Sequence, residues 1–314
     1  MTSLLITGAS GLLGANLARD LAGDYQVSGV FHQTRLVLGG VRMIGADLAE
    51  PGLARMIVGK VRPDYIIHCA AGTNVDRCQS DKAWAMRMNR DMAGMVAAAA
   101  AEYDVRLAHI STDAVFDGRS GGYRETDAPR PVNVYGQSKL AGEQAVLQAH
   151  PAALVIRTNL FGWNLADAYA GLAGWFIKNL VEGRQCRGFS DVEFSPILVN
   201  ALGPILLSLM ESNASGVLHV AGADCLSKLA FGRRLAQACG LDAGLIEPSS
   251  VDNAGLAAPR GKRLCLDSTA AEQVLGRSMP TIDDGLEQLV TTTPAAMGVS
   301  RRATAGATIA GEPK

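Results

Sequence analysis

The first half of the chain alternates short apolar runs with longer stretches whose apolar residues recur at every third or fourth position. The short runs have the length and composition of buried strands, and they cover residues 4–7, 26–31, 65–69, 105–110 and 153–158. The stretches between them have the period of helices that bury one face. Regular alternation of strands and helices predicts an α/β fold built on a doubly wound parallel sheet.

The second half of the chain has a less regular pattern. Helices are predicted over residues 175–182, 200–210 and 227–239, and short strands over residues 196–199 and 216–220. These elements are expected to form a smaller C-terminal lobe over a cleft of the first unit. From residue 291 to residue 314 the chain is mostly Ala, Thr, Gly and Ser without an apolar period, which predicts a disordered tail.

The bulk composition is that of an ordinary globular protein. The 314 residues are 48% hydrophobic and 19% charged, with a formal net charge of −1 and no basic run. Neither a nucleic-acid partner nor a membrane-surface partner is therefore expected. The first residues lead directly into a strand, so no signal peptide is predicted, and no apolar run is long enough to span a bilayer. The partner is expected to be a small molecule.

Six cysteines stand at positions 69, 78, 186, 225, 239 and 265. They contain no C-x-x-C pair, and no Cys/His spacing resembles a zinc site, so no metal is predicted. Cys69 lies inside an apolar run and is expected to fill the core. This cysteine usage favours a reducing, cytoplasmic setting.

A glycine-rich turn directly follows the first predicted strand. In Gly8-Ala9-Ser10-Gly11-Leu12-Leu13-Gly14 three glycines recur at intervals of three, a pattern expected by chance roughly 0.4 times in such a chain. Its place between a strand and a helix is what a dinucleotide site requires, because the glycines let the backbone approach a pyrophosphate at the helix N-terminus. The residues expected to bind the cofactor here are Gly8, Ser10, Gly11, Leu12, Leu13 and Gly14.

The glycine turn indicates which part of the chain binds the cofactor. The sheet is predicted to be of the Rossmann type, with residues 1–158 forming the dinucleotide-binding domain and later segments returning to it. Residues 159–290 are expected to form mainly a substrate-binding lobe, where specificity usually resides.

The end of the second predicted strand bears on the choice of cofactor. An NAD site usually has an acid there to bind the ribose 2′-hydroxyl, and no Asp or Glu stands near His32. His32 and Arg35 are expected to accommodate a 2′-phosphate instead, which favours NADPH, with NADH also allowed. The alternative, that Arg35 is only a surface loop residue, is equally open.

Two more strand ends are expected to contact the cofactor. Asp47, followed by Leu48, ends the next short strand and is placed to accept a hydrogen bond from the adenine amine. The small residues Ala70, Ala71 and Gly72 follow the strand over residues 65–69 and leave room for the cofactor to pass. His68, which lies in that strand without an acidic neighbour, is expected to be a core histidine.

Tyr135 and Lys139 are four residues apart in a stretch that predicts a helix, so their side chains share a face. A chance pair with this spacing is expected roughly 0.13 times, and its plain interpretation is a solvated helix face. An ammonium near a phenol lowers the phenol's pKa, which would make Tyr135 a better proton donor near neutral pH. Thr112, at the end of an apolar strand, is placed to hold a carbonyl oxygen beside that phenol. The three groups suit the reduction of a ketone.

Trp84, Met88, Met92 and Met95 recur at helical spacing. Met fills irregular gaps well, so the stripe is expected to be core or a subunit contact. The second interpretation would make the protein a homodimer.

Together these residues resemble the extended short-chain dehydrogenase/reductase family, and within it the dTDP-4-dehydrorhamnose reductase group. The family resemblance rests on the glycine turn and on Tyr135-x-x-x-Lys139. Four further stretches are similar to the group: Ala70-Ala71-x-Thr73-Asn74-Val75-Asp76, Ser111-Thr112-Asp113-x-Val115-Phe116-Asp117-Gly118, Asn133-Val134-Tyr135-Gly136 and Gly216-Val217-Leu218-His219-Val220-Ala221-Gly222. The resemblance covers about residues 3–290 and is densest before residue 160.

The resemblance implies a site and a reaction. Thr112, Tyr135 and Lys139 would be the catalytic triad, and Lys139 would also bind the nicotinamide ribose. The residues implied to bind substrate are Thr73, Asn74, Val75, Thr112, Asp113 and Asn159. The implied reaction is reduction of the 4-keto group of a nucleotide-linked 6-deoxyhexose by NAD(P)H.

Other functions on this fold leave different signatures. Dehydration needs an Asp-Glu pair directly after the Thr, and here Ala114 follows Asp113. Ala114 also stands where the group commonly has Tyr, so the identity of the sugar stays open. A nucleotide-sugar epimerase uses the same Tyr and Lys but holds NAD tightly, and the missing acid near His32 argues against it. A non-catalytic NADP-binding regulatory subunit, like the β-subunit of methionine adenosyltransferase, is the remaining alternative; the intact triad favours an enzyme.

Overall fold

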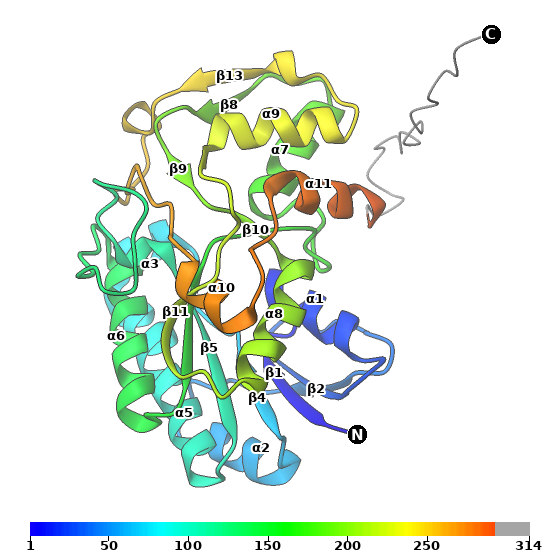
Figure 1. The fold of residues 1–314 in the computed structure, drawn as a ribbon, viewed down its shortest axis with the longest axis vertical. Coiled ribbons are helices and arrows are strands. Elements are labelled where there is room, and N and C mark those ends of the chain that lie inside the picture. The colour runs from blue at the N-terminus through cyan, green and yellow to red at the C-terminus, as the bar shows by residue number, and fades with distance from the viewer. Residues whose placement is uncertain (293–314) are drawn as a thin grey trace, which may run out of the picture.

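The computed structural model describes residues 1–292, which fold around one seven-stranded parallel sheet (Figure 1). Its strands stand in the order β11-β6-β5-β4-β1-β2-β3, and each pairs with its neighbour in parallel. The strands are β1 (Ser3–Thr7), β2 (Gln26–Phe31), β3 (Arg42–Gly45), β4 (Tyr65–His68), β5 (Arg106–Thr112), β6 (Leu154–Thr158) and β11 (Gly216–His219). The chain starts in the middle, builds one side and then crosses back to build the other, which confirms the predicted doubly wound α/β fold.

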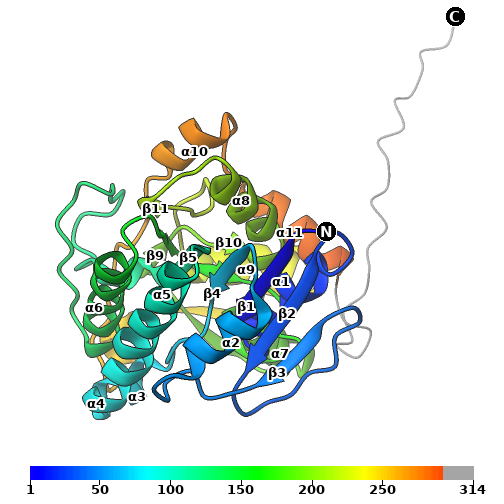
Figure 2. The same ribbon diagram turned by 90° about the horizontal axis from the view of Figure 1, so that it is seen from below.

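Helices cover both faces of this sheet, because successive residues of each strand point to opposite sides (Figure 2). In β1, Leu4 and Ile6 pack in one core with helices α1 (Leu12–Leu21), α8 (Val199–Glu211) and α10 (Thr269–Leu275). Leu5 packs in the other core with α2 (Leu53–Val61), α5 (Met92–Glu102) and α6 (Val134–Ala149). The continuous apolar runs of the sequence are strands buried on both faces.

A broken helix leads from the sheet into α5. It consists of α3 (Val75–Ser80), α4 (Lys82–Met86) and one π-helical turn (Arg87–Asp91) that continues directly into α5. Met92 is buried, and Met88 and Met95 pack against the same core. The methionine stripe is therefore core-facing within this chain, and the homodimer stays a prediction.

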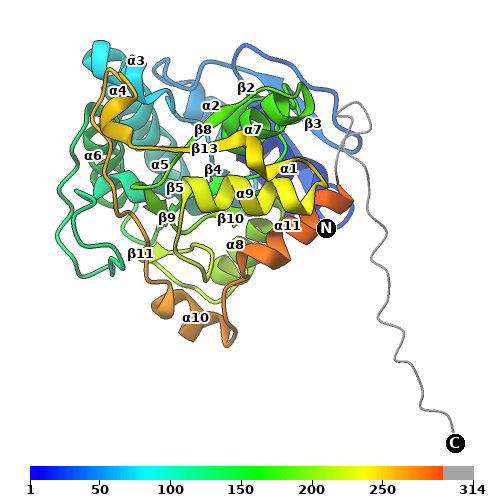
Figure 3. The ribbon, with the colours of Figure 1, turned by 90° about the horizontal axis from the view of Figure 1, so that it is seen from above.

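The second lobe stands above the carboxyl ends of the strands (Figures 1 and 3). Its helices are α7 (Gly171–Val181), α9 (Lys228–Ala238) and α11 (Ile282–Thr291), and its strand pairs are β7 (Leu160–Phe161) with β10 (Ile197–Leu198), β8 (Cys186–Phe189) with β13 (Ile246–Ser249), and β9 (Glu193–Phe194) with β12 (Leu226–Ser227). A separate aromatic core that includes Phe161, Phe176 and Phe231 holds it together. Between these elements, β11, α8 and α10 return to the sheet.

The sequence patterns did not predict the last helix of the lobe. Thr281 accepts a hydrogen bond from the Asp284 amide, and the Asp284 carboxylate accepts one from the Thr281 amide, which together begin α11 as a capping box. Thr291, the first residue of the predicted tail, is the last residue of this helix. Residues 293–314, on which the rest of that prediction falls, lie outside the described residues.

The cysteine spacing gave no sign of a covalent link, yet Cys225 and Cys265 form a disulfide with Cα atoms 5.6 Å apart. Forty residues separate them, so only the fold brings them together. Cys69 is free and half-buried.

No helix among residues 1–292 is both long and apolar enough to cross a membrane. The same residues hold no group of three or more His, Cys, Asp or Glu side chains that is placed to bind a metal ion.

Candidate active site

A cavity of about 700 Å³ lies between the carboxyl ends of the strands and the second lobe. It opens where β1 and β4 lie side by side and the chain leaves them in opposite directions, which is the usual ligand position in such sheets. From the sheet side it is lined by Gly8, Ser10, Gly11, Leu12, Leu13, Gly14, His32, Asp47, Leu48, Ala70, Ala71, Thr73, Val75, Thr112, Asp113, Tyr135 and Lys139. From the lobe side it is lined by Asn159, Val192, Phe194, Lys228, Arg260, Gly261 and Leu264.

The glycine turn has the shape of a cradle for an extended polar group. Gly8 has a φ of +66°, which favours glycine, and a Cβ built on Gly14 would lie 2.3 Å from the Gly8 carbonyl oxygen. Leu12, Leu13 and Gly14 form the first turn of α1 and line the cavity, and the N–H groups of a first helical turn have no intrahelical partner. Among the described residues, no side chain caps this helix and its first turn carries no acid. The turn therefore fits the pyrophosphate of a dinucleotide.

The region next to β2 carries mixed charge. His32 and its neighbours Gln33 and Thr34 line the cavity, whereas Arg35 is not among the lining residues. Asp47 accepts a hydrogen bond from the Ala49 amide at 3.0 Å and forms an ion pair with Arg87 at 3.1 Å. Arg87 also forms an ion pair with Glu50 at 2.6 Å, so two carboxylates share one guanidinium next to this end of the cavity.

The π-helical turn fixes the chain that follows β4 through its residue Asn89. Ala70 and Ala71 line the cavity, but Gly72 does not. The Gly72 amide donates to Asn89 Oδ1 at 2.7 Å, and Asn89 Nδ2 donates to the Gly72 carbonyl at 3.0 Å and to Ser138 Oγ at 2.9 Å. Asn89 is buried. It therefore ties the end of β4 to helix α6.

Thr112, Tyr135 and Lys139 all line the cavity. Thr112 is the last residue of β5. Asn133 begins α6 by accepting a hydrogen bond from the Gly136 amide at 2.8 Å, which puts Tyr135 in the first turn of that helix. Hydrogen bonding from Thr112 lowers the pKa of the Tyr135 phenol.

The ammonium of Lys139 does not act on the phenol in the expected way. Lys139 Nζ donates to the Ile110 carbonyl oxygen at 2.6 Å, and burial lowers the pKa of Lys139 to about 8. Burial raises the pKa of Tyr135 above its ordinary value, and only the hydrogen bond with Thr112 opposes this. The expectation that Lys139 lowers the pKa of Tyr135 is therefore wrong for this structure, because the ammonium is held on β5.

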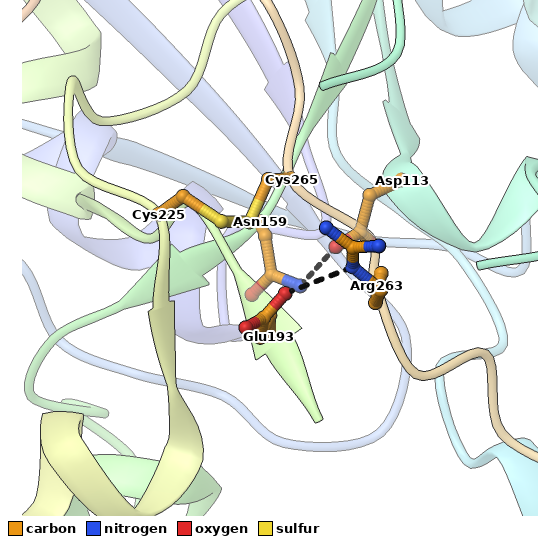
Figure 4. Close-up of a disulfide and its surroundings, with 6 residues drawn as sticks. All are labelled: Asp113, Asn159, Glu193, Cys225, Arg263 and Cys265. Atoms are coloured by element: carbon orange, nitrogen blue, oxygen red, sulfur yellow. Dashed lines mark hydrogen bonds and ion pairs between the residues drawn. A yellow bond between two sulfur atoms is a disulfide. The ribbon is translucent and has the colours of Figure 1, made fainter. Parts of the chain in front are cut away.

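Asp113 is a buried carboxyl group at the centre of the site. Its Oδ1 accepts a hydrogen bond from Thr112 Oγ1 at 3.0 Å. Its Oδ2 accepts one from Asn159 Nδ2 at 2.6 Å (Figure 4). Burial raises the pKa of Asp113 to about 6, against the lowering effect of these hydrogen bonds and of the Lys228 charge.

A sequence model of the RmlD substrate binding domain family matches residues 1–294. The chain belongs to that family. The resemblance to dTDP-4-dehydrorhamnose reductases stated above is confirmed by this match and by the relatives that follow.

Individual relatives of this RmlD family chain cover most of its length. A protein of Haloferax volcanii named "Probable low-salt glycan biosynthesis reductase Agl14" is 33% identical over 288 residues, which are 90% of this chain and 96% of that protein. A dTDP-4-dehydrorhamnose reductase of Mycobacterium tuberculosis is 35% identical over 276 residues, 84% of each chain. The solved structure of a dTDP-4-dehydrorhamnose reductase from Bacillus anthracis in complex with NADP has a TM-score of 0.80 at 28% identity, and covers 93% of this chain and 100% of that one.

The substrate side of the RmlD family chain differs in part from the sequence expectation. Thr73 and Val75 line the cavity. Asn74 is not among the lining residues, and its side chain begins α3 by accepting from the Arg77 amide at 2.9 Å.

Two functional candidates in this RmlD family chain escaped sequence reasoning because their partners are remote in sequence. Lys228, the first residue of α9, lines the cavity, and no carboxylate of the described residues lies within ion-pairing distance of its ammonium. Asn89 lies in no recognisable sequence motif. A Ser227 that begins a helix directly before a lysine was the only local indication for Lys228.

Proposed function

We propose that this protein is an NADPH-dependent reductase of the 4-keto group of a nucleotide-linked 6-deoxyhexose, with NADH as a second reductant. The observation that carries the proposal is that Thr112, Tyr135 and Lys139 line the same cavity as the glycine turn. The names of the relatives, which are reductases of nucleotide-linked deoxysugars, support the same activity.

NADPH supplies a hydride when it is bound, and the protein's task is to place and protonate the ketone. Gly8, Gly11 and Gly14 would hold the pyrophosphate, and His32, which lines the cavity at the end of β2, would face a 2′-phosphate. Lys139, held by the Ile110 carbonyl and pointing from α6 toward β5, would bind the nicotinamide ribose.

Tyr135 would give its proton to the carbonyl oxygen. Its raised pKa keeps the phenol protonated across neutral pH. An alkoxide is a stronger base than a phenolate, so the transfer is favourable even from a weak phenolic acid. Thr112 lies beside Tyr135 and would hold the same oxygen, which fixes the carbonyl for attack from the cofactor side.

Lys228 and Arg260 would bind the anionic part of a nucleotide sugar. Both line the lobe side of the cavity. Arg260 forms an ion pair with Asp76 at 3.1 Å. Lys228 is therefore the lining cation without a carboxylate partner among the described residues. A diphosphate would be the natural partner for this pair.

The test is NADPH oxidation with dTDP-4-keto-6-deoxyhexoses as substrates, comparing the wild type with Tyr135→Phe. We expect turnover by the wild type and a loss of about 10²-fold or more in kcat for the variant, the usual contribution of a general acid. Tyr103→Phe, which changes a tyrosine outside the cavity lining, is the control. A wild type that binds NADPH but reduces no 4-keto nucleotide sugar would favour the regulatory alternative.

A further inference from the structure

Thr158 carries a buried hydroxyl without a hydrogen-bond partner in the described part of the chain. It is the last residue of β6, and only 3% of it is exposed. Within residues 1–292, three residues hold buried side-chain nitrogen or oxygen atoms that lack a partner: His68, His109 and Thr158. Of these three, Thr158 alone lines the cavity. Because a buried hydroxyl without a hydrogen bond destabilises the fold, such a group in a cavity wall indicates a ligand contact.

The sheet places this hydroxyl beside that of Thr112. Parallel pairing of β5 and β6 sets Thr112 opposite Thr158. Two residues before them, Ile110 and Ile156 pack in the same core, so Thr112 and Thr158 point to the same face of the sheet. Both threonines end their strands and line the cavity. Two hydroxyls therefore lie side by side at the carboxyl ends of β5 and β6.

The two hydroxyls differ in the hydrogen bonds that they already make. Thr112 Oγ1 donates to Asp113 Oδ1 at 3.0 Å and accepts from the Ala114 amide at 3.2 Å. The Thr112 proton must leave Asp113 before it can reach a ligand. The Thr158 hydroxyl makes no hydrogen bond to the described residues, so its proton can be donated into the cavity at once.

The segment that follows Thr158 fixes its position. Asn159 Nδ2 donates to Asp113 Oδ2 at 2.6 Å (Figure 4). The Asn159 carbonyl accepts from the Ile197 amide at 2.9 Å. These bonds tie the end of β6 to the residue after β5 and to β10. A donor on such a rigid element loses little freedom when it binds, which favours a specific contact.

We propose that Thr158 is a ligand-binding residue whose hydroxyl donates a hydrogen bond to a carbonyl oxygen at the ends of β5 and β6. The inference rests on the proposed function, which brings two carbonyls to this end of the cavity: the carboxamide of the nicotinamide and the ketone of the sugar. The anionic parts of both ligands would lie elsewhere, at the glycine turn and beside Lys228 and Arg260, so an uncharged partner suits the uncharged hydroxyl. No proton is transferred in this contact.

Thr158→Val tests the contact, because it replaces the hydroxyl by a methyl group of similar volume. We expect a loss of about three- to tenfold in one binding or kinetic constant, the net value of a neutral hydrogen bond. Weaker NADPH binding in a fluorescence titration would identify the carboxamide as the acceptor. A lower kcat/KM for the 4-keto nucleotide sugar at saturating NADPH, with NADPH binding unchanged, would identify the ketone. Thr158→Ser keeps the hydroxyl and should restore both constants. If neither constant changes in Thr158→Val, the inference is overturned.

Urea unfolding without ligand separates this role from a structural one. Since the Thr158 hydroxyl has no partner among the described residues, Thr158→Val should not lower the urea midpoint. Thr7→Val is the matched comparison, because Thr7 is also buried at the end of a strand but lies outside the cavity lining. Its hydroxyl bonds His68 Nδ1 at 2.7 Å and the Ala70 amide at 3.1 Å, so its loss should lower the midpoint. An equal decrease in both variants would show that Thr158 serves the fold, and would contradict the proposal.

The NADPH titration also distinguishes failure of this inference from failure of the proposed function. If the wild type reduces no 4-keto nucleotide sugar, the proposed function fails on its own. Weaker NADPH binding by Thr158→Val than by Thr158→Ser would then support the contact, and equal binding would refute it. Thr158→Ala, which also removes the hydroxyl, replaces Thr158→Val if that variant does not fold.

Discussion

The disulfide between Cys225 and Cys265 joins two segments that both contribute to the lobe side of the cavity (Figure 4). Cys225 precedes Lys228 by three residues, and Cys265 directly follows Leu264. Both Lys228 and Leu264 line the cavity. The bond therefore links two segments that form the lobe side of the cavity.

Breaking this bond should destabilise the protein. For the 40-residue separation, the chain-entropy account gives a loss of about 4 kcal/mol in the free energy of unfolding for Cys225→Ser. Urea unfolding measures it. A dithiol reductant should reproduce the loss in the wild type and have no effect on the variant; a wild type that is insensitive to reductant would count against the disulfide.

Replacing Gly14 should remove cofactor binding. In Gly14→Ala the added Cβ would lie 2.3 Å from the Gly8 carbonyl, so the turn must open and the pyrophosphate cradle is lost. We expect NADPH affinity to fall at least about tenfold, because each 1.4 kcal/mol of lost contact costs that factor. Fluorescence titration with NADPH checks this. Gly23→Ala, which would meet nothing within 4 Å, should bind normally.

Asn89→Ala should destabilise the contact between the end of β4 and helix α6. The variant loses three buried hydrogen bonds, to the Gly72 amide, the Gly72 carbonyl and Ser138. Unsatisfied buried groups cost about 1–3 kcal/mol each at most, so a loss of roughly 3 kcal/mol in unfolding free energy is expected together with a lower kcat. Asn179→Ala, which removes one surface bond to the Trp175 carbonyl, is the comparison, and equal effects of the two changes would refute the account.

Lys228→Met should weaken substrate binding more than catalysis. Lys228 lines the cavity, and its ammonium, which lies 5.9 Å from the Phe189 ring centroid, has no ion-pair partner within residues 1–292. Its loss should therefore raise KM for the nucleotide sugar at least about tenfold with a smaller change in kcat. Lys178→Met on α7 changes a lysine outside the cavity lining and should leave both constants unchanged. Steady-state kinetics at saturating NADPH distinguishes the outcomes.

The histidine pair below the site should make stability depend on pH. His68 and His109 stack with ring centroids 5.2 Å apart, and burial lowers the pKa of His68 to about 3 and that of His109 well below its ordinary value. Between pH 6.5 and 3 the unfolded chain binds protons that the folded chain refuses, so stability falls as the pH falls through this window.

Replacing one imidazole by an apolar ring tests the direction of this pH dependence of stability. Both ring nitrogens of His109 are buried without a hydrogen-bond partner. His109→Phe should therefore raise the unfolding free energy by about 1 kcal/mol at neutral pH and reduce its decline in acid. Urea unfolding at several pH values measures both effects, and an unchanged slope would show that the pair does not govern acid sensitivity.

Asp113 gives the folding stability a pH dependence opposite to that of the two histidines. With its pKa raised from 3.8 to about 6, the folded chain holds a proton between these values that the unfolded chain has released, so this contribution to stability is lost as the pH rises through 6. Asp113→Asn should accordingly be more stable than the wild type at neutral pH, which urea unfolding measures.

What could be predicted from the sequence was local. The strand β1, the glycine turn and the i, i+4 pair of Tyr135 and Lys139 each lie within one short stretch, and their periodicity or spacing is a property of that stretch alone. The contact of Lys139 with Ile110 could not be predicted, because β5 and α6 meet only in the folded sheet. The same holds for the Cys225–Cys265 bond. His68, expected to be a core histidine, is buried and bonded to Thr7 at 2.7 Å, but its second nitrogen has no partner.

The position of β11 in the chain limits where the protein can be truncated. β11 pairs with β6, yet it enters only after the chain has passed through β7, α7, β8, β9 and β10 of the lobe. A fragment ending at Thr158 would expose the whole backbone edge of β6, whose five residues are otherwise all buried. Bare apolar edges template intermolecular pairing, so such a truncation should aggregate rather than yield an isolated nucleotide-binding unit. Residues 1–158 and the chain that follows them should therefore be expressed as one piece.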